Sequence, residues 1–245
     1  MRLTVTLPSV NPDLLVQALD NLAAACVLEH EVVVVRPAPP PLLRARWVRD
    51  ELMAGCNAGH AQALSVARGE FLFPWVDDHA LPRGWDAAVV AEFEAREART
   101  TRRPYMLGVR QAAVRPQVGT CFGVYYPYFP LVRTEDAEAL GWYDGTYRVG
   151  FGDCDLAMRW WAAGGIAEWS AGTYATPLPE DGARKAGGLG YAPPDYARFV
   201  DRWAPVFGRT WGAGWRDLRD FNRDFDLATL ADPAQRTFSP ERRAF

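Results

Sequence analysis

The chain has 245 residues, 49% of them hydrophobic, so it is long enough to bury the core of one α/β domain. A net charge of -3 gives no electrostatic basis for binding nucleic acid. Four widely spaced cysteines indicate neither a zinc site nor a disulfide framework and are typical of a cytoplasmic protein. No apolar run approaches the ~18 residues of a membrane span, and early prolines interrupt any signal-peptide core.

The first part of the chain has the pattern of a βαβ unit. Alternation over residues 3–7 predicts a strand, and Asn11 is placed to cap a helix that has Pro12 at its first position. Helical spacing of apolar residues follows over residues 14–23. The four valines Val32–Val35 predict a second strand, of the kind that is buried in parallel sheets.

The next segment is expected to be a loop followed by helices. Residues 36–41 are rich in proline and must be a loop. We expect a weak helix over residues 42–53. A turn over residues 55–60, with Asn57 as the capping residue, then leads into a helix over residues 61–67.

A short apolar strand that ends in two acids is the centre of the pattern. Residues 71–76 form the strand, and Asp77, Asp78 and His79 follow it. Acids at the end of a buried strand are costly unless something pairs with them. Ligands bind at that edge in open α/β sheets, and a divalent metal with a phosphorylated ligand would satisfy both carboxylates. The alternative is an acidic turn in which Asp78 caps the next helix.

The second half of the chain continues the alternation of helices and strands. In chain order we expect a helix over 85–99, strands over 105–114 and 121–132, a short helix from Thr134, a helix from about Gly152 to Trp161, a strand over 166–169 and a helix over 195–207. Residues 172–194 are too long for an ordinary connector, so they predict a lid or a binding loop.

Four stretches of the chain together resemble the GT-A glycosyltransferases, in particular the large family 2 group that uses nucleotide-sugar donors. The stretches are Val5–Asn11, Asn57–Gly59 with Ala67–Glu70, Val76–Asp78 with Pro82 and Gly84–Trp85, and Gly152–Leu156 with Arg159. The resemblance implies a GT-A, Rossmann-like fold of three layers, α/β/α, with a mostly parallel central sheet. Residues 1–170 would form the nucleotide-sugar-binding and catalytic core. Residues 171–245 would add a flexible loop and a small C-terminal helical appendage on the acceptor side of the same domain.

In that family an acidic D-x-D-type motif binds Mn²⁺ or Mg²⁺, which grips the donor diphosphate. The resemblance implies that Asp78 is the metal ligand and that Asp77 contacts the donor ribose or sugar. In the alternative register, Asp77-x-His79, the imidazole of His79 is itself a ligand, and imidazole suits Mn²⁺ better than Mg²⁺. His79 is otherwise a capping or solvent-facing side chain.

The resemblance also places Asp153 on the family's catalytic base. A carboxylate near the acceptor hydroxyl removes its proton as the oxygen attacks the anomeric carbon. Asp155 and Arg159 lie four residues apart and share a helix face. Trp142 and Tyr143, with Asp155, are the candidates for the acceptor pocket. The alternative for Asp153 is a helix cap.

The candidate donor-binding residues are Pro8, Ser9, Asn11, Arg36, Asn57 and Asp77. The chain departs from the family at three points. Arg36 stands where the second strand usually ends in an Asp, so base recognition must differ. Gly152 stands where Glu is common. A His that often completes the metal site is absent, or is replaced within residues 176–181.

The resulting hypothesis is an inverting glycosyltransferase that moves a sugar from a nucleotide-diphosphate donor to the hydroxyl of a sugar or glycoconjugate, with Mn²⁺ or Mg²⁺. The first alternative is a catalytically inactive GT-A fold that binds a sugar or nucleotide. The second is a nucleotidyltransferase, which normally has a Gly-rich basic loop after its first strand. Pro8–Asn11 is not such a loop.

Overall fold

The computed structural model of the protein describes residues 1–40, 45–50, 55–111, 119–121, 124–148, 150–178, 193–207 and 219–221. Its helices are α1 (Pro12–Ala25), α2 (Cys56–Leu64), α3 (Trp85–Glu97), α4 (Thr134–Leu140), α5 (Gly152–Ala162) and α7 (Pro193–Phe207). The strands of the large sheet are β1 (Leu3–Pro8), β2 (His30–Arg36), β3 (Arg46–Arg49), β4 (Phe71–Pro74), β5 (His79–Ala80), β6 (Tyr105–Gln111), β9 (Phe129–Arg133) and β10 (Ile166–Pro177). A small sheet contains β7 (Gly119–Cys121), β8 (Val124–Tyr126) and β11 (Arg219–Phe221).

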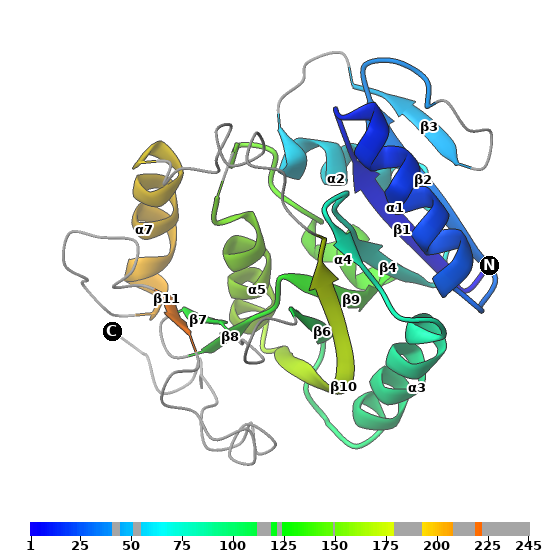
Figure 1. The fold of residues 1–245 in the computed structure, drawn as a ribbon. Helices are drawn as coiled ribbons and strands as arrows, with labels where there is room; N and C mark the ends of the chain where they lie inside the picture. The colour runs from blue at the N-terminus through cyan, green and yellow to red at the C-terminus, as the bar shows by residue number, and fades with distance from the viewer. Residues whose placement is uncertain are drawn as a thin grey trace.

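The large sheet runs in the order β3-β2-β1-β4-β9-β6-β10-β5, with helices packed on both faces (Figure 1). The first four strands in this order are parallel, as are β6 and β10. β9 is antiparallel to both of its neighbours, and β5 is antiparallel to β10. The predicted α/β fold with a mostly parallel central sheet is therefore confirmed.

The two faces of the sheet are covered by different helices, as alternation along a strand requires. On one face, Phe71 of β4 meets Phe93 of α3 edge to face at 5.1 Å between ring centroids. Helix α1 covers the same face over β1 and β2 (Figure 1). On the opposite face, His60 of α2 hydrogen-bonds Thr6 of β1, with 2.7 Å between Nδ1 and Oγ1.

The predicted cap of α1 is confirmed. The Asn11 carboxamide oxygen accepts hydrogen bonds from the backbone N–H groups of Asp13 and Leu14, at 3.0 and 3.2 Å. Pro12 occupies the first turn, where its missing N–H costs no hydrogen bond. The cap fixes the start of α1 directly after the carboxyl end of β1.

The helix predicted over residues 42–53 is wrong. The described part of this segment is the strand β3, which pairs in parallel with β2 from Val33↔Arg46 to Arg36↔Arg49. The open edge of β2 offers backbone partners to this segment, and they outweigh its weak helical pattern. Residues 41–44 and 51–54 lie outside the described residues.

Two other boundaries differ from the prediction. The segment predicted as one strand over 121–132 contains the last residue of β7, then β8 and β9, and β8 and β9 belong to different sheets. The strand predicted to end at Trp169 continues to Pro177, with a shift of register between Trp169 and Tyr174. Part of the predicted loop 172–194 is therefore strand, and residues 179–192 lie outside the described part.

The C-terminal helix packs directly on the core. The ring of Phe199 in α7 lies 5.0 Å from that of Phe151, which precedes α5. The proposed division of the chain at residue 170 stays a prediction. Among the described helices, none is both long and apolar enough to cross a membrane.

Candidate active site

The adjacent acids Asp77 and Asp78 follow β4 at the carboxyl edge of the large sheet, as predicted. Ser9, directly after β1, donates a hydrogen bond from Oγ to Asp77 Oδ2 at 2.6 Å. Because β1 and β4 are parallel neighbours, this bond joins the two loops that leave the same edge. Pro8, Ser9 and Asp77, three of the predicted donor-binding residues, therefore lie together.

Asp78 and His79 form a hydrogen-bonded pair with very different exposure. The Asp78 side chain is 51% exposed, whereas His79 is buried against the rings of Trp75 and Phe129. His79 Nδ1 lies 2.6 Å from Asp78 Oδ1, and His79 Nε2 lies 2.9 Å from Gln111 Nε2. A carboxylate accepts and an amide NH₂ donates, so the proton sits on Nδ1 and Nε2 accepts from Gln111.

This arrangement fixes the orientation of Asp78. Both imidazole nitrogens of His79 have protein partners, which is the pattern of a residue that orients a metal-binding carboxylate. The end of β10 lies against the same pair, because Pro177 pairs with His79 and Leu178 N–H donates to the Asp78 carbonyl at 2.8 Å. The segment expected to replace the missing histidine thus begins beside Asp78. His79 as a metal ligand stays a prediction.

The start of α2 lies against the loop before α5 on one side and against the end of β1, next to the adjacent acids Asp77 and Asp78, on the other. A Cβ on Gly55, which has φ +103°, would lie 2.6 Å from the Arg148 carbonyl, and a Cβ on Gly59 would lie 2.7 Å from Pro8. Asn57 is inside the helix and not its cap, so the predicted capping role is wrong. Its amide instead donates to the Tyr147 carbonyl at 2.8 Å, because the loop before α5 comes close enough to take the bond.

The departure at Gly152 has a physical explanation in this contact. A Cβ at Gly152 would lie 2.3 Å from the Asn57 carboxamide oxygen, a separation that atoms do not adopt. Gly152 therefore allows α2 and the start of α5 to approach closely. A glutamate could not occupy this position without displacing the Asn57 side chain, whose amide bonds the Tyr147 carbonyl.

Cys56 and Tyr143 show that the acidic pair and Asp153 share one region. Burial, followed by the charges of Asp77 and Asp78, raises the pKa of Cys56 to about 12, although solvent still reaches the residue. Burial also raises the pKa of Tyr143 well above its usual value, followed by the charges of Asp153 and Cys56. Cys56 thus lies near Asp77 and Asp78, and Tyr143 lies near both Cys56 and Asp153. The first turn of α2, which contains Cys56, is therefore near Asp77 and Asp78, and Tyr143 links it to Asp153.

Asp153 occupies the first turn of α5 and is half-buried. Its Oδ1 accepts a hydrogen bond from the Cys154 N–H at 2.9 Å. The residue at the N-cap is Phe151, whose φ of +65° is costly for a bulky side chain. The geometry of Asp153 therefore depends on whatever keeps Phe151 in that conformation.

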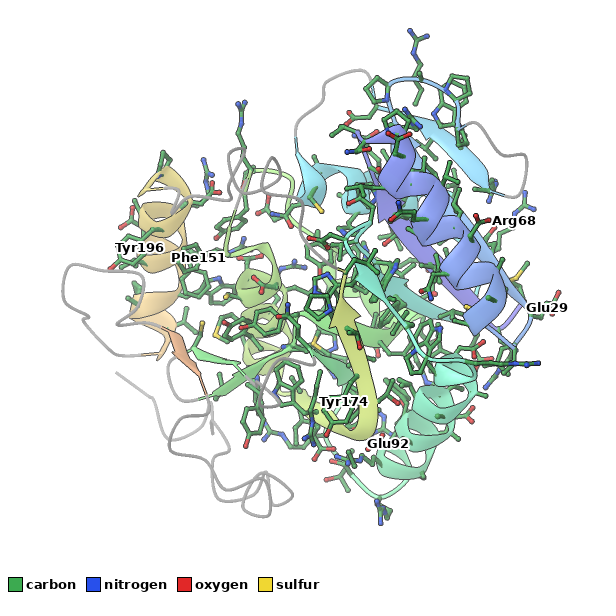
Figure 2. The ribbon with its side chains drawn as sticks, in the orientation of Figure 1. Glu29, Arg68, Glu92, Phe151, Tyr174 and Tyr196 are labelled. Carbon is green, nitrogen blue, oxygen red and sulfur yellow. The ribbon has the colours of Figure 1, made fainter. Side chains whose placement is uncertain are left out.

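Helix α7 supplies that support. Tyr196 and Phe199 pack against the Phe151 ring, at 5.9 and 5.0 Å between centroids, and Figure 2 shows Phe151 and Tyr196 facing each other. The buried carboxylate of Asp195 accepts hydrogen bonds from the N–H groups of Arg148 and Gly150, at 3.2 and 3.0 Å. The sequence predicted a helix starting at Asp195 but gave no signal for these contacts, which join segments 45 or more residues apart.

Asp155 is a structural carboxylate. It has 0% exposure, and its Oδ1 accepts from Tyr147 and Trp203, at 3.2 and 2.8 Å. The predicted pair with Arg159 is confirmed at 2.9 Å between Nε and Oδ2, and Arg159 also donates to the Leu140 carbonyl at 2.9 Å. These contacts join α4, α5 and α7. Contact with an acceptor stays a prediction for Asp155.

The other predicted residues have contacts within the fold. Trp142 and Tyr143 are buried, and the Tyr143 ring lies 4.7 Å from that of His60, so both belong to the core around α2. Asn11 uses its carboxamide to cap α1. Arg36 ends β2 at the same sheet edge as Asp77. The donor and acceptor contacts of these residues stay predictions.

The residues that could hold a metal here are few. Among the described residues, no group of three or more His, Cys, Asp or Glu side chains is placed to bind one ion. Asp77 and Asp78 nevertheless offer hard carboxylate oxygens on adjacent residues at the carboxyl edge of the sheet. Mg²⁺ and similar ions are often bound by one or two carboxylates together with substrate phosphates and water. The acids present fit an ion that arrives with a diphosphate.

Comparison with solved structures identifies the fold. The chain is similar to S. aureus TarS 1–349, with a TM-score of 0.55 and 16% identity over 73% of this chain and 60% of that one. It is also similar to the mannosyltransferase PcManGT from Pyrobaculum calidifontis, solved with GDP-Man and Mn²⁺, with a TM-score of 0.57 and 18% identity over 84% of this chain and 71% of that one. The protein has the GT-A fold.

A third similar structure is GalNAc-T7, solved with UDP, GalNAc and Mn²⁺, with a TM-score of 0.62 and 12% identity over 84% of this chain. The match spans 50% of GalNAc-T7, and 60% and 37% of two TarS structures, so this chain corresponds to part of these proteins. No family model matches the chain, and no curated protein matches it in sequence. At these identities the likeness shows the fold alone.

Proposed function

We propose that the protein is a glycosyltransferase that moves a sugar from a nucleotide-diphosphate donor to an acceptor hydroxyl. The observation that carries the proposal is that Asp77 and Asp78 follow β4 at the carboxyl edge of the sheet, while Asp153 follows Gly152, which packs against Asn57 in the first turn of α2. Ligands bind at this edge in open α/β sheets. The GT-A fold shared with nucleotide-sugar enzymes supports the same assignment.

The donor half of the site contains Asp77 and Asp78. With a diphosphate bound, Asp78 would hold Mn²⁺ or Mg²⁺, a cation that neutralises the charge on the leaving nucleotide diphosphate, and Asp77 would contact the donor ribose or sugar. His79 keeps Asp78 in one orientation through the bond to Nδ1. Ser9 likewise restrains Asp77, so both acids are positioned before a ligand arrives.

The acceptor half contains Asp153. Its carboxylate takes the proton of the acceptor hydroxyl as that oxygen forms a bond to the anomeric carbon of the sugar. The bond between that carbon and the donor phosphate oxygen breaks in the same step, and its electron pair leaves with the nucleotide diphosphate. Direct displacement of this kind inverts the configuration at the anomeric carbon.

The second candidate is a GT-A-fold protein that binds a sugar nucleotide without transferring the sugar. The observation that favours it is the small ligand set, since no group of three or more His, Cys, Asp or Glu side chains among the described residues is placed to bind one ion. Both candidates predict nucleotide binding, so turnover distinguishes them.

Donor hydrolysis or transfer, measured with a panel of nucleotide sugars in the presence of Mn²⁺, tests the proposal. We expect turnover with at least one donor, and a fall of about 10²–10⁴-fold in Asp153→Asn, the usual contribution of a general base. Asp20→Asn, on the exposed side of α1, is the matched control and should retain full activity. Nucleotide binding without turnover of any donor would support the inactive binding protein.

A further inference from the structure

The end of β2 contains a buried cation whose charge the described residues leave uncompensated. Arg36 is 8% exposed, and its Nε and Nη1 atoms have no hydrogen-bond partner among the described residues. Burying an ionised group without a partner is costly, so such a group is uncommon unless it has a use. The guanidinium has only donors to offer, which means that its missing partner is an acceptor.

An exposed tryptophan lies beside this arginine. Trp47 of β3 is 38% exposed, and its indole N–H donates to the Arg36 carbonyl at 3.0 Å. In the register of the two strands Val34 pairs with Trp47 and Arg36 with Arg49, so the side chains of Trp47 and Arg36 belong to the same face of the sheet. A flat apolar ring and a guanidinium whose Nε and Nη1 have no partner among the described residues thus lie at one corner of the sheet edge.

The position of this corner relative to the acids suggests which part of a ligand it receives. Along the edge the order of strands is β2, β1, β4, which places Arg36 two strand spacings, about 10 Å, from Asp77. Ser9, which hydrogen-bonds Asp77, follows the strand between them. A nucleoside diphosphate with its phosphates at the acids has the length to place its base near Arg36 and Trp47.

We propose that Arg36 and Trp47 form the nucleobase site and select guanine, so that the donor is a guanosine-diphosphate sugar. This inference rests on the proposed function. Guanine presents two adjacent acceptors, O6 and N7, which a guanidinium binds with two hydrogen bonds. Uracil, thymine and adenine instead place a donor next to an acceptor and would face the arginine with an N–H group.

The two residues have separable tasks in this site. Trp47 stacks on the flat face of the base, an interaction that tolerates any base. Arg36 hydrogen-bonds the edge of the base and determines which base is preferred. Because Nε and Nη1 are sealed from solvent in the free protein, the Arg36 side chain must rotate about its own bonds when the base enters.

The test is calorimetric titration of GDP, UDP, ADP and pyrophosphate, each with Mn²⁺, into the full chain. We expect wild type to bind GDP about tenfold or more tighter than UDP, in line with the discrimination of a bidentate contact. Arg36→Gln should bind GDP about tenfold more weakly than wild type and should bind UDP and pyrophosphate with unchanged affinity. Trp47→Leu should weaken all three nucleotides together and leave pyrophosphate unchanged. Arg49→Gln removes the same charge from the paired position on β3 and should change nothing.

Base analogues test the inference on the wild-type protein alone. Inosine diphosphate keeps O6 and N7 and should bind like GDP. The 7-deaza analogue of GDP lacks N7 and should bind several-fold more weakly. Thermal unfolding checks that Arg36→Gln folds, and its midpoint should equal or exceed that of wild type because an unpartnered buried charge is removed.

Three results would overturn the inference. Equal loss of GDP, UDP and pyrophosphate in Arg36→Gln would show a phosphate contact. A preference for UDP, or an unchanged GDP preference in Arg36→Gln, would show that the base is read elsewhere, and the proposed glycosyltransferase would still stand. No binding of any nucleotide to wild type would overturn this inference and the proposed function together.

Discussion

Asp78 and Asp155 are both aspartates close to proposed catalytic groups, yet the structure treats them in opposite ways. Asp155 has no exposed surface and its oxygens accept bonds from Tyr147, Arg159 and Trp203. Asp78 has a half-exposed side chain whose Oδ1 is oriented by His79. A carboxylate surrounded by protein donors stabilises the fold, whereas one held in place at the solvent boundary is suited to a ligand. Stability and binding measurements should therefore separate the two.

The largest expected effect is on stability at Asp155. Asp155→Asn removes the charge opposite Arg159 and turns an amide donor toward groups that already donate. Breaking a buried charge pair costs about 3–5 kcal/mol, so we expect a loss of that size in urea denaturation. Asp78→Asn, at the exposed position, should stay within about 0.5 kcal/mol of wild type. Equal losses in both variants would remove the distinction between the two carboxylates.

A smaller effect is expected where α7 reaches Asp155. Trp203→Phe keeps an aromatic ring but removes the N–H that donates to Asp155 Oδ1 at 2.8 Å. A hydrogen bond to a charged group contributes about 1.5–3 kcal/mol, which is the expected loss in the free energy of unfolding. In the double variant with Asp155→Asn the two losses should not add, because they share this bond. Full additivity would show that Trp203 acts through packing alone.

The burial of His60 predicts that the free energy of unfolding depends on pH. Burial lowers its pKa to about 3, so between pH 6.5 and pH 3 the unfolded chain binds a proton that the folded chain does not. Stability is therefore lost as the pH falls through this window, by about 2 kcal/mol at pH 5 for this group. His60→Phe, which keeps a ring against Tyr143, should show a correspondingly flatter dependence in urea denaturation between pH 7 and pH 5. If His60→Phe and wild type lost stability equally between pH 7 and pH 5, His60 would not be the source of the pH dependence.

The smallest expected effect is at His79. His79→Gln keeps a side-chain donor but loses the rigid ring against Trp75 and Phe129, so Asp78 is oriented less firmly. Loss of such an orienting partner weakens metal binding about tenfold or more. The Mn²⁺ dependence of nucleotide binding measures this loss. A complete loss of Mn²⁺ dependence would instead indicate that His79 is a metal ligand.

The sequence located the acids but not what surrounds them. The place of Asp77 and Asp78 after a buried strand marks them as candidates, the family resemblance adds Asp153, and the pair of Asp155 with Arg159 follows from helical spacing alone. The partners of Asp155 on α7 lie up to 48 residues away, and no local pattern encodes such a contact. The strand β3 was missed for a related reason, since its pairing partner β2 and not its own pattern determines its conformation.

The glycine at position 152 departs from the family pattern, and only the structure explains it. From the sequence it was a missing glutamate. In the structure, a Cβ at this position would collide with Asn57, and the contact brings α2 against the start of α5. The same contact places the proposed base near the acidic pair, which residue spacing alone did not require.

The central claim is that Asp78 binds a nucleoside diphosphate through a divalent cation. Calorimetric titration of nucleoside diphosphates tests it most directly, with wild type and Asp78→Asn compared in Mn²⁺ and in EDTA. We predict that binding weakens about tenfold or more on removal of Mn²⁺ and to a similar extent in Asp78→Asn, while Asp20→Asn behaves as wild type. Equal affinity in Mn²⁺ and EDTA, with no change in Asp78→Asn, would contradict the claim.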